Sequence, residues 1–378
     1  MNTIDRDANA FGVDEAACRG RQRRLLGEMA RLGVDLAVLS CRESVQWLTG
    51  ALVRPPFEPV AAITADGHVT LVVPDRQLNE PAAADERLGY AAKLHSTIRD
   101  DQRVASSVVL RSALEDVPRH VAAEFATFGP FLWFLTVGDD ARLIDIGPTI
   151  FQLRRKKDAD ELAKLRRANE ANRAMYERAR EIVRPGVNEL DVYSELHAVA
   201  VRTLGEALTY FGQDFRSAAR GGLPRDRAIQ AGELYILDLG VGFRGYYSDN
   251  ARTLAVGGEP TAEQQRAWQA VVDVFPGVEA SVRPGASCRA LFETVQRQLD
   301  ANAPWQFLTH LGHGVGLAPH EGPHLNPNWD DTFAEGDFIA VEPGLYHDEL
   351  RYGVRLEQNY VVTADGVELL TPWPMGLC

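Results

Sequence analysis

The chain has 378 residues, 45% of them hydrophobic, and a formal net charge of −13 at pH 7. That length allows two domains, each with its own core. The negative charge argues against nucleic acid and anionic membrane surfaces as partners, because both would repel the protein.

Neither export nor membrane insertion is expected. The first twenty residues lack the apolar core of a signal peptide. The longest apolar run, FGPFLWFLTVG (128–138), contains a proline and is too short to span a bilayer. We therefore expect a reduced, cytoplasmic protein, since the cysteines follow no metal or redox spacing; pairing of Cys18 with Cys41 is the alternative.

The first part of the chain predicts a small α/β domain over residues 1–152. Residues 13–32 have the period of an amphipathic helix. DLAVLS (35–40) is typical of a buried strand, and AAITADGHVTLVVPD (61–75) of a hairpin that turns at Asp66-Gly67.

A second domain is expected over residues 153–378. It begins with a long charged helix at 154–182, in which acidic residues precede basic ones at helical spacing. The tetrapeptide VRPG then occurs twice, at Val183–Gly186 and Val282–Gly285, each time between two helical patterns that lead towards strands. This repetition predicts an internal duplication of an α-α-β-β unit, and hence an α+β fold.

Two strand pairs of this domain carry acidic residues. Asp238 in LYILDLG and Asp249 in YYSDNARTLAV are equally far from the centre of a predicted hairpin tip, VGFRG (241–245). Glu342 in FIAVEPG and Glu357 in GVRLEQNYVV are likewise centred on the loop YHDELRY. Regular antiparallel pairing would place the members of each pair opposite one another on one sheet face.

Four such carboxylates would repel one another, and burial would push at least one to protonate. Two divalent cations would neutralise them, and oxygen ligands suit manganese, iron, cobalt or zinc in an open site. His313, between Gly312 and Gly314 in LGHGVG, is the candidate nitrogen ligand. In the alternative interpretation the acids face water or pair with arginines (Arg244, Arg252 or Arg355).

The segment HEGPH (320–324) has the order of a zinc-peptidase motif. That motif works only on a helix, where both histidines share one face. Gly322 and Pro323 disfavour a helix, so we do not expect a zinc site of this type.

Taken together, LDLG, YYSDNART, HLGHGVGLAPHEGP, VEPGLY and GVRLEQNYVV resemble the pita-bread metallohydrolases: aminopeptidase P, prolidase, methionine aminopeptidase and creatinase. The matching segments cover most of residues 155–375. VQWLTG at Val45–Gly50 is similar to a stretch in the smaller, creatinase-like N-terminal domain of aminopeptidase P and prolidase.

The resemblance implies a role for each matching residue. Asp238 would chelate one metal, Asp249 and Glu357 would bridge two, and His313 and Glu342 would bind the second. Glu342 would also accept a proton during catalysis. His320 and Arg355 would contact substrate, whereas His310 is expected in a strand and His324 at the rim or in a loop.

One position departs from the family pattern. Xaa-Pro peptidases carry a histidine upstream of the first aspartate, in a stretch like P-H-G-x-P. Alignment on Pro224 and Gly232 puts Gly221 at that position. Such a donor can contribute about 10²–10³ in rate. Arg220 is a candidate replacement, and a rise in dipeptide turnover on Gly221→His would show that the missing donor limits peptide cleavage.

The resemblance predicts a dinuclear hydrolase, an Xaa-Pro aminopeptidase or dipeptidase that attacks the bond before proline with a metal-bridging hydroxide. Manganese is the expected metal, with cobalt, zinc or iron as alternatives, and a homodimer is the expected assembly. The missing histidine favours a second hypothesis, a hydrolase or lyase for a small zwitterion, similar to ectoine hydrolase or dimethylsulfoniopropionate lyase. A third hypothesis is a binding protein with an inactive site.

Overall fold

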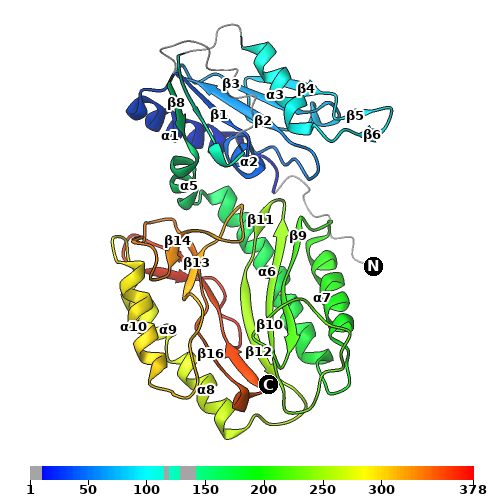
Figure 1. The fold of residues 1–378 in the computed structure, drawn as a ribbon, viewed down its shortest axis with the longest axis vertical. Helices are drawn as coiled ribbons and strands as arrows, with labels where there is room; N and C mark the ends of the chain where they lie inside the picture. Colours follow the sequence, from blue (N-terminus) through cyan, green and yellow to red (C-terminus); the bar gives the residue numbers. More distant parts are fainter. Residues whose placement is uncertain (1–10, 115–118, 128–141) are drawn as a thin grey trace. The chain divides into compact units, whose positions relative to one another are not determined.

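The computed structural model describes residues 11–114, 119–127 and 142–378. It divides into two compact units, Met1–Arg154 and Arg155–Cys378 (Figure 1). None of the described helices combines the length and the apolar character needed to cross a bilayer. The apolar run at 128–138 lies outside the described residues.

A six-stranded sheet, in the order β4-β3-β2-β1-β7-β8, forms the centre of unit 1. The helix expected at 13–32 is confirmed as α1 (Glu15–Leu32), which Asp14 caps by accepting a hydrogen bond from the Ala17 N–H. The predicted hairpin is also confirmed, since β2 and β3 pair antiparallel. The strands are β1 (Leu36–Leu39), β2 (Val60–Thr64), β3 (Val69–Pro74), β4 (Glu86–Tyr90), β7 (His120–Ala123) and β8 (Arg142–Asp145), with the small hairpin β5 (Lys93–Leu94) and β6 (Thr97–Ile98); the further helices are α2 (Arg42–Thr49), α3 (Gln102–Ala113) and α5 (Gly147–Arg155).

The charged helix expected at 154–182 begins later than predicted. α5 ends at Arg155, and a new helix, α6 (Ala159–Ile182), follows. Asp158 and Glu161 form a capping box, in which each side chain accepts a backbone N–H of the other residue. This reciprocal cap sets the start of α6, so the basic residues before it are not part of the helix.

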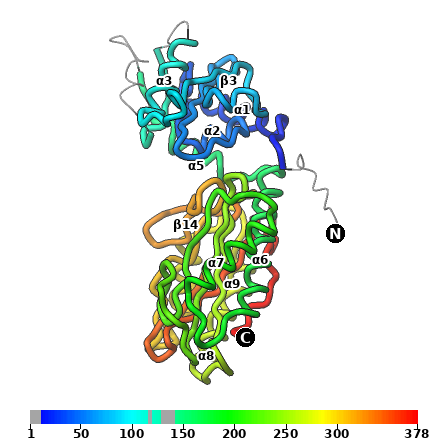
Figure 2. The backbone as a smooth tube through the Cα atoms, turned by 90° about the vertical axis from the view of Figure 1, so that its right-hand side faces the viewer, coloured from blue at the N-terminus to red at the C-terminus, as the bar shows by residue number. Residues whose placement is uncertain are grey.

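Unit 2 contains the predicted duplication. Each VRPG leads into a helix, α7 (Glu189–Leu204) or α10 (Cys288–Asp300). Strands follow each helix, and Figure 2 shows α6 and α7 running side by side. The remaining elements are α8 (Ala262–Val272), α9 (Phe275–Ser281), β9 (Tyr210–Ser217), β10 (Leu234–Phe243), β11 (Tyr246–Tyr247), β12 (Asn250–Ala255), β13 (Gly312–Gly314), β14 (Glu321–Leu325), β15 (Phe338–Val341), β16 (Gly344–His347), β17 (Tyr352–Arg355), β18 (Gln358–Val362) and β19 (Val367–Leu369).

The register predicted for the first acidic strand pair is wrong by two residues. Asp238 lies opposite Ala251, not Asp249. The turn consists of Arg244 and Gly245, both with positive φ (50° and 86°), which moves the hairpin centre one residue further along the chain. A two-residue shift keeps side chains on the same sheet face, so Asp238 and Asp249 remain diagonal neighbours.

The register predicted for the second pair agrees with the structure. Val341 pairs with Gln358 in one ladder, and Gly344 pairs with Arg355 in the next. Both ladders have the same register, so Glu342 and Glu357 lie opposite one another between them.

A buried carboxylate organises the segment between β9 and β10. Glu189, at the start of α7, is fully buried and accepts hydrogen bonds from the backbone N–H and hydroxyl of Ser217. It also accepts three from Arg225, from its backbone N–H, Nε and Nη2. This network holds residues 217–225, including Gly221, in place.

We predict that Glu189→Gln lowers the free energy of unfolding by about 2–4 kcal/mol, because an amide N–H would replace an acceptor facing Arg225. The urea unfolding midpoint would measure the loss. Glu195→Gln is the matched control, since Glu195 pairs with Arg178 and Arg202 at the surface, and its change should stay within about 0.5 kcal/mol. Equal effects in both variants would contradict the role of Glu189.

Candidate metal centre

The five predicted ligand residues lie together in unit 2. Among the described residues, three groups of ligand atoms within 4.8 Å of one another contain predicted ligands: Asp238-Asp249-Glu357, His310-His313-Glu342 and Asp249-His313-His320. His313 joins them, since its Nε2 lies 3.6 Å from Asp249 Oδ2 and 3.3 Å from Glu342 Oε1. All five predicted ligands are buried, and the largest exposed fraction among them is 6%.

Several ligand-type atoms in this cluster have no protein partner. Among the described residues, Asp238 Oδ1, Glu357 Oε2 and His313 Nε2 are buried and make no hydrogen bond. The Nδ1 atom of His313 lies 3.0 Å from the Gly314 carbonyl oxygen, which favours a proton on Nδ1 and a lone pair on Nε2. Buried polar atoms are normally satisfied. These residues therefore fit divalent cations, which would take up the unused lone pairs.

The electrostatics of the cluster also favour a cation. Burial raises the pKa of Asp249 well above its usual value, and the nearby charges of Glu357 and Asp238 add to the effect. Burial, then Glu342 and Asp238, raises the pKa of Glu357 in the same way. Burial also raises the pKa of Asp238 to about 6, although Arg355 opposes the shift. Without added positive charge, the carboxylates therefore resist ionisation.

Amide side chains orient two of the acids. Gln213 Nε2 donates to Asp249 Oδ1 at 2.9 Å. Asn359, which is fully buried, donates to the Asp249 carbonyl oxygen at 2.7 Å and lies 3.5 Å from Glu357 Oε1. Neither amide was identified from the sequence, and only their places on β9 and β18 bring them to the acids.

His310 lies closer to the centre than predicted. It was expected in a strand, but it precedes β13, and its Nε2 lies 2.8 Å from Glu342 Oε1. Burial opposes ionisation of Glu342, but the neighbouring groups, of which the hydrogen-bonded His310 contributes most, together outweigh burial and lower the pKa of Glu342. Glu342 is consequently ionised at neutral pH.

His320 lies beside the metal cluster and is exposed. Its ring stacks on His313, with centroids 3.7 Å apart and planes inclined by 14°. Although the side chain reaches solvent, partial loss of hydration and the neighbouring rings of His313 and His310 lower the pKa of His320 to about 4. The ring is therefore neutral at pH 7 and can donate one N–H to a ligand.

Arg355 pairs with one predicted ligand. Its Nη2 lies 3.2 Å from Asp238 Oδ2 and also contacts Asp214 Oδ2. The alternative in which arginines neutralise the acids therefore holds for Asp238 in part. It does not hold for Arg244, which pairs with Glu206, or for Arg252, which donates to the Glu357 and Pro374 carbonyl oxygens.

The position of the missing histidine is occupied by another side chain. Gly221 has φ +155°, and an added Cβ would lie 2.5 Å from Asp214 Cγ and closer still to Oδ2. A histidine restored at position 221 would thus collide with Asp214, so Gly221→His does not test the missing donor alone. Arg220 is exposed and donates to the Tyr352 hydroxyl at 2.8 Å.

Residues 321–324 of HEGPH lie in strand β14 and His320 directly precedes it, which excludes a helical zinc motif. Glu321 is paired with Lys157 at 3.0 Å. His324 was expected at the rim or in a loop, but it lies in β14, where its Nδ1 is 2.8 Å from Asp331 Oδ2 and its ring stacks on Trp329. His324 makes no contact with the acidic cluster in any of these interactions.

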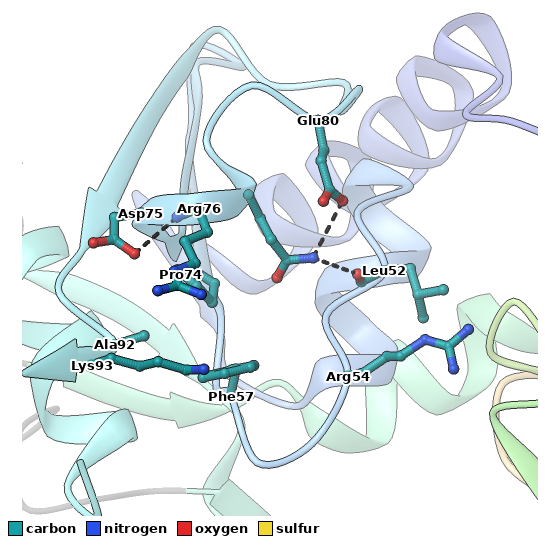
Figure 3. A pocket seen from close by; sticks show the side chains of 10 residues that line it. Leu52, Arg54, Phe57, Pro74, Asp75, Arg76, Glu80, Ala92 and Lys93 are labelled. Carbon is teal, nitrogen blue, oxygen red and sulfur yellow. Dashed lines mark hydrogen bonds between the residues drawn. The ribbon is translucent and has the colours of Figure 1, made fainter. Parts of the chain in front are cut away.

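A separate pocket of about 410 Å³ lies in unit 1 (Figure 3). The Gln77 amide in its wall donates to the Leu52 carbonyl oxygen and to Glu80. None of the predicted site residues lines it. Its charged lining combines both signs and specifies no ligand: Arg54, Asp75, Arg76, Glu80 and Lys93.

We predict that His313→Ala weakens metal binding at least about tenfold, because it removes the nitrogen ligand, whereas His324→Ala leaves metal content unchanged. Mass-spectrometric metal analysis after dialysis would measure both. The two substitutions remove the same side chain from neighbouring strands, so each controls for the other. Loss of metal in His324→Ala would show that our interpretation of HEGPH is wrong.

A second prediction concerns the chelator-treated protein, in which Asp249→Asn should raise the free energy of unfolding by about 1–3 kcal/mol at pH 8. The pKa of Asp249 is raised in the folded state, so its contribution to stability is present below the unfolded pKa and lost as pH rises through the folded pKa. The increase in the free energy of unfolding caused by Asp249→Asn should therefore be smaller at pH 4 than at pH 8.

With saturating Mn²⁺ the order of stabilities should reverse, because the variant lacks a ligand. Thermal unfolding with and without chelator would measure both effects. A variant that is less stable than the wild type under both conditions would contradict the repulsion between these acids.

Comparisons with known proteins agree with this geometry. Residues 163–364 match the model of metallopeptidase family M24, and residues 21–155 match that of the creatinase/prolidase N-terminal domain. An uncharacterized peptidase of Bacillus subtilis, YqhT, is 27% identical over 94% of this chain and 98% of its own.

Solved structures share the predicted fold, which is thereby confirmed. The prolidase of Pyrococcus horikoshii has a TM-score of 0.79 at 22% identity, over 95% of this chain and all of its own. The Xaa-Pro dipeptidase of Bacillus anthracis has a TM-score of 0.77 at 23% identity, over 96% and 99%. With its acidic cluster and both domains matched, the chain belongs to metallopeptidase family M24.

Proposed function

We propose that the chain is a dinuclear metal-dependent hydrolase that cleaves the peptide bond before proline, as an Xaa-Pro aminopeptidase or an Xaa-Pro dipeptidase. The observation that carries the proposal is the set of three buried ligand-type atoms without a protein partner, on Asp238, Glu357 and His313. The specificity for proline is supported by the structural neighbours, whose names describe prolidases and Xaa-Pro peptidases.

The proposed division of ligands between two cations follows the groups Asp238-Asp249-Glu357 and His310-His313-Glu342. Asp238 would hold one ion and His313 and Glu342 the other, and Asp249 and Glu357 would complete the ligand set, as the family resemblance implies. Such ions supply Lewis acidity and lower the pKa of a bound water towards neutrality. Mn²⁺ is the proposed metal.

The side chains around the ions have separate tasks. Glu342 is ionised, so its carboxylate can accept a proton from the attacking water and pass it to the leaving nitrogen. His310 holds Glu342 Oε1 in place from 2.8 Å. The neutral ring of His320 can donate an N–H to the carbonyl oxygen of the substrate, where negative charge develops.

A second candidate function is hydrolysis or lysis of a small zwitterion. The observation that favours it is Asp214, whose carboxylate lies against Gly221, the residue that the sequence alignment puts in place of the peptidase histidine. An acid there cannot donate a hydrogen bond to a developing oxyanion when it is ionised.

We predict two bound metal equivalents, hydrolysis of Xaa-Pro dipeptides or N-terminal Xaa-Pro bonds, and loss of activity with chelator that added Mn²⁺ restores. Glu342→Gln should lower kcat by about 10²–10⁴-fold, because it removes the proton acceptor. A panel of Xaa-Pro peptides, cyclic amidines and betaine-like compounds would measure specificity. Activity on the last two classes alone would favour the second candidate, and a protein that binds no metal would contradict both.

A further inference from the structure

Asp214 lies in the row of acids, although the sequence did not single it out. On β9 it is the direct partner of Asp238 on β10 in an antiparallel ladder. Directly paired residues present their side chains on the same sheet face. Asp214 therefore belongs to the face that carries the predicted metal ligands.

The segment after β9 is shaped around this carboxylate. Asp214 Oδ1 accepts the backbone N–H of Gly222 at 2.6 Å. Gly221 leaves room for Asp214, because any side chain at 221 would overlap the carboxylate. The hydrogen bonds of Glu189 with Ser217 and Arg225 hold both ends of the same segment. The position of Asp214 is therefore fixed by buried hydrogen bonds and packing.

Asp214 changes the charge of the substrate side of the centre. Arg355 Nη2 is shared between Asp214 and Asp238, so one guanidinium faces two carboxylates. An unshared Arg355 would attract a substrate carboxylate, since guanidinium groups bind carboxylates well. Here Arg355 is paired with Asp214 and Asp238 and is not free to bind a substrate carboxylate. One guanidinium balances only one of the two carboxylates, so the negative charge that remains favours a cation.

The carboxylate retains capacity for a ligand. An ionised aspartate offers about four lone-pair positions, and the described partners are the Gly222 N–H and Arg355. The Asp214 side chain keeps 20% of its surface exposed. Substrate hydrogen atoms can therefore reach it.

An aromatic pair adjoins Asp214 on the same face. Tyr210 is four residues earlier on β9, and its ring lies over Gly212 and Gly240, since a Cβ at either residue would meet the ring. The rings of Tyr210 and Tyr247 have centroids 5.0 Å apart. Aromatic faces attract cations, so this pair and the carboxylate favour the same kind of ligand.

We propose that Asp214 is a specificity-determining residue that receives the positively charged α-amino group that lies beside the scissile amide of the substrate. The proposal rests on the hydrolytic function proposed above and names the residue that recognises the free amino terminus. In the competing interpretation, Asp214 only positions Arg355 and the segment after β9. That role would affect stability but not the preference for charge.

The test compares binding of L-alaninamide with binding of propionamide, which lacks only the ammonium group. Calorimetric titration of the manganese-loaded protein would measure both affinities, and neither compound contains a bond before proline. The wild type should prefer alaninamide by about 10–100-fold, the range expected of a charge-assisted hydrogen bond. Asp214→Asn, which keeps the shape and the acceptor for Gly222, should abolish the preference.

Controls separate charge from folding. Glu206→Gln removes a carboxylate that pairs with Arg244 and should keep the preference. Gly221→Ala should displace Asp214 and reduce the preference, whereas Gly258→Ala should not, since Gly258 has a similar φ of +147° and nothing near its Cβ position. If Asp214→Asn fails to fold, the comparison of Gly221→Ala with Gly258→Ala still tests whether the position of Asp214 sets the preference for the amine.

The outcomes distinguish this proposal from the proposed function. An amine bound only through a metal would keep its preference in Asp214→Asn, and that result would overturn the role of Asp214. Equal binding of both amides by the wild type would overturn it as well. Cleavage of Xaa-Pro peptides is measured separately, so its absence would contradict the peptidase function and leave the binding result intact.

Discussion

Four carboxylates are buried within reach of one another in unit 2, and like charges removed from water are unstable unless other groups compensate for them. Asp238, Asp249, Glu342 and Glu357 come from two hairpins that the duplication places face to face. The rest of the site can be understood as a response to this repulsion. Arg355 supplies positive charge, Gln213 and Asn359 donate hydrogen bonds, and Asp214 adds a fifth carboxylate beside Asp238.

The compensation within the protein is partial. Arg355 and His310 each contact one acid, and Gln213 and Asn359 donate to others. These contacts fix the orientation of the acids before any ion binds, which reduces the cost of organising the site. Among the described residues, Asp238 Oδ1, Glu357 Oε2 and His313 Nε2 still make no hydrogen bond, and these atoms are available to a metal.

The fold around the site is that of the M24 family, and the sequence departs from the expected family pattern at Gly221. The hydrogen bond between Glu189 and Arg225 fixes residues 217–225. Within this segment Gly221 has no side chain, which leaves space for the Asp214 carboxylate. A fold supports many activities, and specificity resides in such local features. The metal cluster therefore supports the proposed hydrolysis, while Asp214 beside it supports the proposed preference for a positively charged substrate.

The sequence by itself determined the features that depend on neighbours along the chain. These include the helix at 13–32, the strand patterns, the exclusion of a helix by Gly322 and Pro323, and the register of Glu342 opposite Glu357. The tight turn at Arg244-Gly245 was not determined, because Gly242 and Gly245 flank Phe243-Arg244 and local preference allows more than one centre.

Only the tertiary structure decided which distant side chains complete the site. Asp214 and Arg355 are 141 residues apart, and Gln213 meets Asp249 only because β9 lies beside β10. His310 reaches Glu342 from a segment outside any strand. No local pattern specifies such contacts, since backbone preferences act over a few residues, whereas the position of a charge relative to its partner depends on how whole strands pack.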